Sequence, residues 1–172
     1  MEIFKYILPA FIVMMTAYLL FDRMLSSEEK KRKHELTKKN QDILTPIRLR
    51  AYERMMLLLE RTNPATMVVD VIKPGMTCIE FQTQLIQNIR REFEHNYAQQ
   101  IYVSNELWEA VSATRENLIK LVNTTAAHFN PGDTASNMAE HIIRIYAETE
   151  QTPTRVAIEI LKSETSNQFF IK

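Results

Sequence analysis

The sequence predicts an all-α protein with an N-terminal transmembrane helix, a polar helical stalk and a compact bundle of five or six helices. Glycine is scarce, with two residues among 172, whereas a β-sandwich or barrel needs many turns of the kind that glycine allows. Four prolines follow a Thr or an Asn; one of them, Pro131, lies in a turn, and the other three are placed as is typical of helix starts: Pro46, Pro64 and Pro153. Beyond residue 46, apolar side chains recur every three or four residues, as on one face of a helix.

The first expected element is a transmembrane anchor over residues 1–25. Residues 3–21 are 19 mostly apolar residues with one charge, Lys5, and as a helix they would extend roughly 28 Å, close to the thickness of a bilayer core. A cleaved signal peptide is the main alternative, but it needs a shorter apolar core and a small-residue cleavage site. A buried core helix is a weaker alternative, because basic sequence follows at once. We therefore expect an uncleaved anchor in contact with the lipid bilayer.

Residues 26–45 are expected to form a polar helical stalk. Acidic residues precede basic ones by four positions, which stabilises an isolated helix. The positive-inside rule places the C-terminal domain in the cytoplasm. Residues 1–61 carry 12 Lys+Arg against 8 Asp+Glu, and residues 62–172 carry 9 against 13, so the membrane-proximal part is basic. Six stalk residues are expected near anionic headgroups, with a merely solvated linker as the alternative: Lys30, Lys31, Arg32, Lys33, Lys38 and Lys39.

The bundle is expected over residues 46–165, followed by a flexible tail over 166–172. Thr45-Pro46 indicates a new helix start, and the apolar face of helix 46–61 is either core or a contact surface. Residues 64–72 are short and rich in β-branched side chains, so periodicity does not separate helix from strand. A short helix is favoured there, because no partner strand is visible.

Three further helices and a last one complete the bundle. Thr77 and Glu80 have the spacing of a capping box, which predicts a helix from residue 78 to about 100. Ser104 is the expected N-cap of helix 105–129. The turn at 130–133 leaves Asp133 or Thr134 as the cap of helix 134–149. The last helix starts at Pro153, and the residues from 163 onward are expected to be loose.

The segment 90–108 is the most distinctive part of the chain, because it combines aromatic side chains with many hydrogen-bonding ones. This composition favours a recognition surface, but it is also typical of a helix end whose Asn and Gln side chains satisfy nearby backbone groups. The candidate binding residues are Arg91, Glu94, His95, Asn96, Tyr97, Gln100, Tyr102 and Trp108.

No motif for nucleotide binding, metalloprotease, serine hydrolase or dithiol chemistry occurs in the sequence, so we assign no catalytic residue, metal site or cofactor. Glu94-His95 and Glu140-His141 are adjacent pairs, whereas metal sites in bundles use a spacing of three, which turns both ligands inward. The lone Cys78 lies on an apolar stripe, which favours packing over a nucleophilic role. The basic run in the stalk is short and mixed with glutamates, so we expect no nucleic-acid partner.

Three features together carry a family resemblance: an N-terminal span, the sequence IRLRAYERMMLLLER at 47–61 with the Pro-Gly-Met turn at 74–76, and REFEHNYAQQIYVSNELWEAV at 91–111. They resemble an uncharacterised family of membrane-anchored helical proteins of Bacteroidota. The resemblance covers most of the chain and implies a bacterial inner-membrane location. It brings no activity and no catalytic residue.

The sequence therefore favours a non-enzymatic interaction or scaffold module, held at the membrane within a larger assembly with a protein partner or as a homo-oligomer. The alternative is a small-ligand-binding or metal-dependent helical bundle enzyme that uses the segment 90–108.

Overall fold

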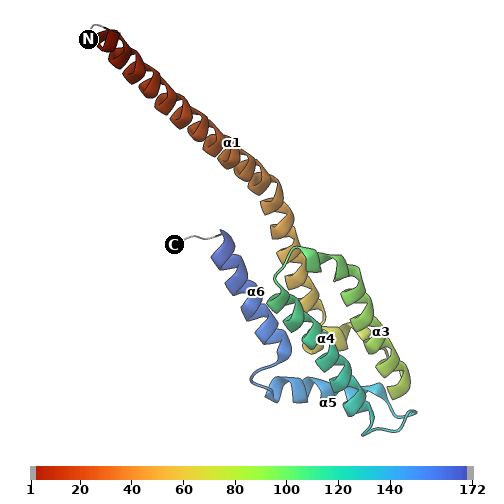
Figure 1. The fold of residues 1–172 in the computed structure, drawn as a ribbon. Coiled ribbons are helices and arrows are strands. Elements are labelled where there is room, and N and C mark those ends of the chain that lie inside the picture. Colours follow the sequence, from red (N-terminus) through yellow and green to blue (C-terminus); the bar gives the residue numbers. More distant parts are fainter. Residues whose placement is uncertain (1–2, 170–172) are drawn as a thin grey trace. The chain divides into compact units, whose positions relative to one another are not determined.

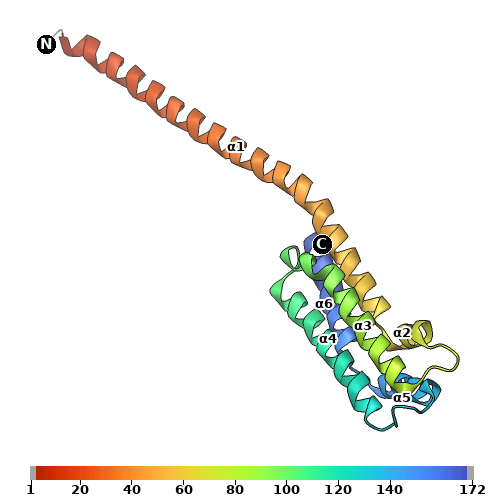
Figure 2. The ribbon, with the colours of Figure 1, turned by 90° about the vertical axis from the view of Figure 1, so that its right-hand side faces the viewer.

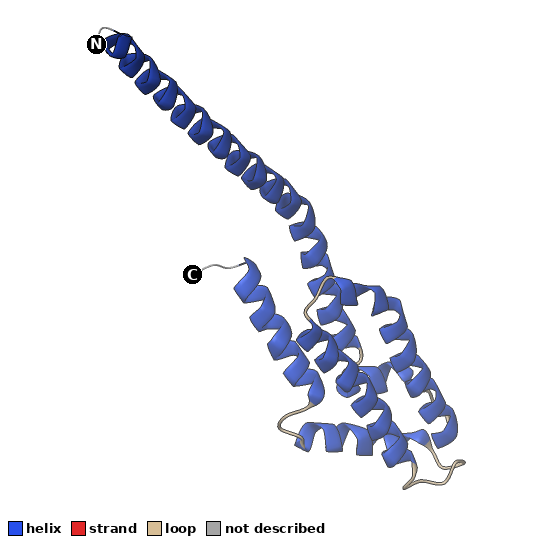
Figure 3. Cartoon of the chain, in the orientation of Figure 1, coloured by secondary structure: helices blue, strands red, loops and turns tan. Residues whose placement is uncertain are grey.

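The computed structural model describes residues 3–169, except for the side chains of residues 3–10, 12, 13 and 17, and shows helices joined by turns (Figures 1 and 3). The elements are α1 (Ile3–Arg61), α2 (Pro64–Val71), α3 (Cys78–Asn96), the 3-10 helix η1 (Tyr97–Ile101), α4 (Asn105–Ala126), α5 (Ala135–Glu148) and α6 (Pro153–Phe169). The prediction of an all-α fold is confirmed. Within residues 3–169 the one β-type pairing is an isolated antiparallel bridge between Thr77 and Thr134.

The chain divides into two units, residues 1–46 and residues 47–172. In the first unit, every side chain that the structure describes is exposed. Within the described residues, no helix is long and apolar enough to span a bilayer. Much of the predicted anchor, residues 1–25, lies outside the described side chains. Large apolar side chains that are described there expose between 49% and 72% of their surface: Phe11, Met14, Met15, Tyr18, Leu19, Leu20, Phe21, Met24 and Leu25.

Helix α1 does not start anew at Pro46, as the sequence predicted, but runs unbroken from Ile3 to Arg61. Proline has no N–H, so the helix loses one i→i−4 hydrogen bond at this position. The residues that follow, Ile47 to Arg61, are mostly Leu, Arg, Met, Ala and Glu, which are strong helix formers. Because of their high helix propensity, the helix continues past Pro46, a position at which the Thr-Pro pattern alone predicted a helix start.

From Ala51 onward, the apolar face of residues 47–61 belongs to the core of the second unit, whereas Ile47 and Leu49 expose 38% and 43% of their surfaces. Ala51, Tyr52, Met55, Leu58 and Leu59 each expose 3% of their surface or less. The sequence left open whether this face is core or contact surface, and the structure places it in the core.

Helix α4 is central to the bundle, since it packs against α3, α5 and α6, while α2 packs against α3 and α5 (Figures 1 and 2). One apolar core joins these helices. Its largest fully buried side chains include Phe81, Leu85 and Ile89 of α3, Leu107 and Val111 of α4, Met138 and Ile142 of α5, and Leu161 of α6.

The starts of α3 and α5 are joined to each other. The predicted capping box is confirmed: Thr77 Oγ1 accepts from the Glu80 N–H and Glu80 Oε2 accepts from the Thr77 N–H, at 3.4 and 3.0 Å. The Cys78 N–H donates to the Asp133 carbonyl at 2.8 Å, and the Ala135 N–H donates to the Met76 carbonyl at 3.0 Å. Thr134 is the N-cap of α5 without a side-chain capping bond, and the bridge satisfies the N–H of Ala135, the first residue of the helix.

Residues 64–71 are a helix, as favoured, and the Asn63 side chain caps it by accepting from the Ala65 N–H. Two predicted helix ends were too late. Helix α3 ends at Asn96, whose φ of −108° and ψ of 2° leave the α region, and α4 ends at Ala126 instead of 129. Both ends pass into tighter turns, which apolar periodicity does not distinguish from a continuing helix.

Residues 163–169, which were expected to be loose, continue α6 to Phe169, and the remaining residues of the predicted tail, 170–172, lie outside the described residues. Tertiary contacts support the additional turns: Glu164, Gln168 and Phe169 all contact Tyr52 of α1. These contacts come from residues more than 100 positions away in the sequence, so no local pattern shows them.

Candidate functional site

The predicted binding segment 90–108 is distributed over the end of α3, η1 and the start of α4. At the end of α3, Arg91 is exposed and donates to Asn88 Oδ1 at 2.6 Å, while Glu94 and His95 are exposed. Asn96 is half-buried, and its Nδ2 donates to the Glu92 carbonyl at 2.9 Å. His95 and Asn96 line one cleft of about 490 Å³, together with Arg54, Leu57, Leu58, Arg61 and Glu92.

The remaining candidates surround η1. The rings of Tyr97 and Trp108 meet edge to face, with centroids 5.5 Å apart. Gln100 and Tyr102 are half-buried, and the Tyr102 carbonyl accepts a hydrogen bond from Arg48 Nε at 3.2 Å. The fold thus groups the eight candidates into a polar helix end and an aromatic turn, and it does not bring them into a single cavity.

The second unit also contains a polar cluster that sequence reasoning missed, made of Arg48, Tyr52, Ser104, Glu164 and Gln168 and called here the Glu164 cluster. Glu164 Oε1 accepts from the Ser104 N–H at 3.0 Å and from Tyr52 Oη at 2.8 Å, and Glu164 Oε2 accepts from Ser104 Oγ at 2.5 Å. The cluster joins three helices, because Tyr52 lies on α1, Ser104 caps α4 and Glu164 lies on α6.

Two further groups approach the phenol of Tyr52. Gln168 Oε1 lies 2.8 Å from Tyr52 Oη, and Arg48 Nη2 donates to the same oxygen at 3.5 Å. A phenol carries one proton, so Tyr52 donates to Glu164 or to Gln168 at any moment. Burial, followed by the hydrogen bond and the negative charge of Glu164, raises the pKa of Tyr52 to about 12, against a smaller lowering by Arg48. Tyr52 is therefore a donor over the whole physiological pH range.

Ser104 is also fully engaged. Its hydroxyl donates to Glu164 and accepts from the Leu107 N–H at 3.1 Å as the predicted N-cap of α4. A carboxylate at the N-terminus of a helix is favoured by the free N–H groups there and by the helix dipole. Glu164 thus acts as a second cap for α4, supplied from a different helix.

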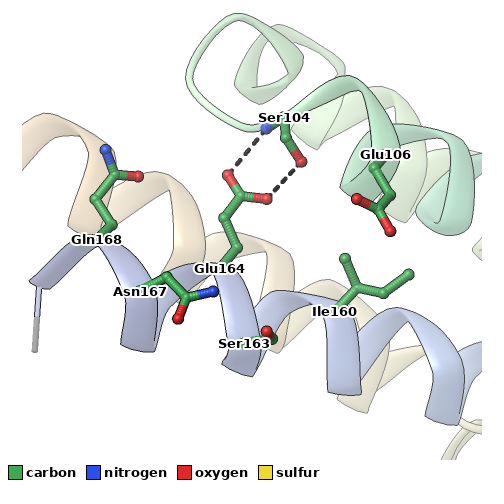
Figure 4. A pocket seen from close by; sticks show the side chains of 7 residues that line it. All are labelled: Ser104, Glu106, Ile160, Ser163, Glu164, Asn167 and Gln168. Carbon is green, nitrogen blue, oxygen red and sulfur yellow. Dashed lines mark hydrogen bonds between the residues drawn. The ribbon is translucent and has the colours of Figure 1, made fainter. Parts of the chain in front are cut away.

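A cleft of about 480 Å³ opens beside this cluster (Figure 4). Glu164 and Ser104 are joined by two hydrogen bonds at its edge, and Glu106 and Ile160 lie further along the two helices. Its lining residues are Ser104, Glu106, Ile160, Ser163, Glu164, Asn167 and Gln168. On another side of α6, a second cleft of about 390 Å³ is lined by Leu49, Tyr52, Glu53, Met56, Leu161, Lys162, Thr165 and Ser166.

Cys78 is a packing residue in this fold. Its side chain exposes 2% of its surface, and Sγ lies 3.6 Å from the Thr134 carbonyl. Burial and then the neighbouring charge of Asp133 raise the pKa of the thiol, which is the opposite of the lowering that activates a cysteine nucleophile.

Among the described residues, no three or more His, Cys, Asp or Glu side chains converge as metal ligands. His128 and His141 approach each other, with ring centroids 6.2 Å apart, and the ring of Phe129 lies edge-on to His141. In the first unit, the stalk residues Lys30, Lys31, Arg32, Lys33, Lys38 and Lys39 are all exposed.

The Glu164 cluster left only a weak trace in the sequence. Ala157, Leu161, Glu164 and Gln168 follow one another at steps of three or four, so Glu164 and Gln168 continue the inner stripe of α6. Because the buried stripe of α6 continues into Glu164 and Gln168, these two polar side chains face the bundle and can make polar contacts there.

No curated protein and no solved structure matches this chain. A family model does match it, over residues 1–168, and that family is described as one of unknown function. Since the match covers nearly the whole of both units, the chain belongs to the family of unknown function DUF7935.

Proposed function

We propose that this chain is a membrane-anchored, non-enzymatic interaction module, in which a helical bundle is held at the membrane as part of a larger assembly. The observation that carries the proposal is the row of exposed apolar side chains on α1 between residues 11 and 25, each exposing 49% to 72% of its surface. Exposed large apolar side chains gathered in this way mark a site that lipid or another protein covers.

Lipid is the favoured cover. Residues 3–21 carry one charge, Lys5, at the end of the segment, where its ammonium group can reach the interface. The exposed basic residues of the stalk begin at Lys30 and Lys31, close enough behind the segment for anionic headgroups to attract these first residues. The excess of basic residues on this side supports a bacterial inner-membrane orientation with the bundle in the cytoplasm.

Two features of the bundle support an interaction role. The polar groups of the Glu164 cluster are engaged with one another and join three helices, so their chemistry is used to hold the fold. The turn after α3, by contrast, presents Tyr97 with 54% and Ile101 with 71% of their surfaces exposed. Exposed aromatic and aliphatic side chains of this kind suit recognition of a protein partner or a second copy.

The anchor is tested by expressing the full chain and a form lacking residues 1–25 in a bacterial host and extracting the membranes with alkaline carbonate. The full chain should stay with the membranes and the shortened form should be released. A full chain that is released like the shortened form would contradict the proposed anchor.

The interaction role is tested by a mild-detergent pull-down of the full chain from native membranes, read by mass spectrometry. A stoichiometric partner is expected, and the double substitution of Tyr97→Ala with Ile101→Ser should remove it. A matched double substitution of exposed residues on another helix, Glu140→Ala with Arg144→Ala, should retain it. Recovery of the full chain alone would contradict the interaction module.

A second candidate function is the binding of a small ligand, and the cleft lined by His95 and Asn96 favours it. Arg54 and Arg61 lie in the same cleft, and Arg61 Nη1 is 3.7 Å from Glu92 Oε2. Native mass spectrometry of the purified chain and melting across a panel of metals and small anions test this function. A chain without bound mass, whose melting is unchanged across the panel and unchanged by His95→Ala, would rule against it.

A further inference from the structure

The two halves of α6 are attached to the bundle by different forces. In the first half, Thr154, Ala157 and Leu161 are buried, with exposures of 2%, 0% and 2%. In the second half, residues 162–169, no side chain is buried, and Glu164, Thr165 and Phe169 are half-buried. Full burial of apolar side chains on α6 therefore ends at Leu161, and in residues 162–169 the apolar side chain that still packs against the core is the half-buried Phe169.

Polar contacts take over beyond that point. Glu164 accepts hydrogen bonds from Ser104 and Tyr52, and Gln168 lies within hydrogen-bond distance of Tyr52. The one ring contact is that of Phe169, which meets the Tyr52 ring edge-on with centroids 5.9 Å apart. The attachment of this half of the helix thus converges on Ser104 and Tyr52, with Glu164 as the group that binds both.

Clefts also border this half of α6 along two of its sides. Ser163, Asn167 and Gln168 line the cleft of about 480 Å³, and Lys162, Thr165 and Ser166 line the cleft of about 390 Å³. A helix end with few buried apolar contacts and open space beside it belongs to the low-stability part of a fold, which opens before the core does.

We propose that residues 162–169 are a latch, which opens as a unit after Leu161 while the rest of the bundle stays folded, and which Glu164 holds closed. Opening uncovers the buried ring of Tyr52 and the half-buried Met56, beside Leu49, which already exposes 43% of its surface in the adjoining cleft. The latch thereby controls access to the Tyr52 and Met56 side chains on α1. The proposal concerns the bundle alone and does not depend on the membrane anchor.

Hydrogen exchange read by mass spectrometry tests the latch on the full chain in mild detergent. The variants are Glu164→Ala, Glu164→Gln and the matched control Glu159→Ala, an exposed glutamate on the same helix whose one ion pair is with Arg155 at 4.0 Å. Hydrogen bonds to a charged group contribute more to stability than neutral ones. Glu164→Ala should therefore accelerate exchange of the 162–169 amides at least about tenfold. Glu164→Gln should have a smaller effect in the same direction, and Glu159→Ala should have none.

Two results would overturn the latch. The first is unchanged exchange over 162–169 in Glu164→Ala. The second is an equal acceleration over residues 107–122 of α4, which would mean that Glu164 stabilises the whole bundle and no separate unit opens.

A second measurement tests the contact between Glu164 and Tyr52 through the titration of the tyrosine. In Glu164→Ala the Tyr52 phenol loses a hydrogen-bond partner and a neighbouring negative charge, both of which raise its pKa. The ultraviolet titration of that tyrosine should therefore move to lower pH than in the unsubstituted chain. An unmoved titration would show that Glu164 does not hold Tyr52 and would also overturn the proposal.

Discussion

Tyr52 shows how one side chain can serve two parts of a fold at once. Its ring is buried, with 3% of its surface exposed, and its hydroxyl reaches Glu164 and Gln168 on α6. A buried phenol normally finds a hydrogen-bond partner, since leaving it without one costs free energy. Here the partner is a carboxylate, which favours the protonated phenol.

The titration of Tyr52 follows from this environment. The pKa of a tyrosine is about 10 in an unfolded chain and about 12 for Tyr52 in the folded chain. Because the folded pKa is raised, the stabilisation is complete below pH 10 and is lost as the pH rises through about 12. Absorbance at 295 nm should show the late titration of Tyr52, which Tyr52→Phe removes. If the late part of the titration remained in Tyr52→Phe, Tyr52 would not be the late-titrating residue, and this prediction would be contradicted.

The capping box at Thr77 gives a prediction for stability. Replacing Thr77 with Ala leaves an N–H at the start of α3 without its side-chain acceptor, so unfolding by urea should become easier by about 1 kcal/mol. Thr83→Ala is the matched control, because Thr83 is exposed within the same helix and its hydroxyl bonds the Ile79 carbonyl. The control should be neutral or slightly stabilising. Equal losses in both variants would show that the cap adds nothing beyond helix propensity.

At the scale of the element, sequence rules succeeded where a local interaction decides the structure. The caps at Asn63, Thr77 and Ser104 each bond a backbone N–H two or three residues away, and short-range spacing reveals such bonds. The rules failed where contacts with residues distant in the sequence determine where a helix ends. The end of α6 depends on Tyr52 and Ser104, and Ser104 is 60 residues from Glu164.

The same reason limits what could be predicted of the candidate site. The sequence singled out segment 90–108 by its composition, and Ser104 by its position as a cap. Composition does not show that a glutamate from a presumed tail reaches that cap. Tertiary contact turned an exposed-looking Glu164 into the centre of the polar cluster.

The two faces of α1 in the second unit make a matched pair for mutation. Leu59 is fully buried and Leu57 exposes 53% of its surface, although both are leucines on one helix. Leu59→Ala should lower the free energy of unfolding by about 3 kcal/mol, through lost burial and the cavity left behind. Leu57→Ala should change it by less than about 0.5 kcal/mol. Urea denaturation of both variants measures the difference, and similar losses would mean that Leu57 is also covered, by a partner or a second copy.

At the scale of the whole molecule, the two units differ in the solvent exposure of their side chains. Residues 47–172 bury an apolar core of their own, with side chains from α1 to α6. The described side chains of residues 11–46 are exposed and include both the apolar row and the basic stalk. The first unit thus differs from the second in composition, with an apolar row followed by a basic stretch.

This division predicts that residues 47–172 fold without the first unit. A fragment of residues 47–172 retains every residue of the core and of the Glu164 cluster, so it should unfold cooperatively in urea with the same midpoint as the full chain in detergent. Leu59→Ala should lower that midpoint in the fragment as it does in the full chain, because the cavity forms in the same core. Circular dichroism follows both transitions. A fragment that lacks a cooperative transition, or whose midpoint ignores Leu59→Ala, would show that the first unit is needed to complete the bundle.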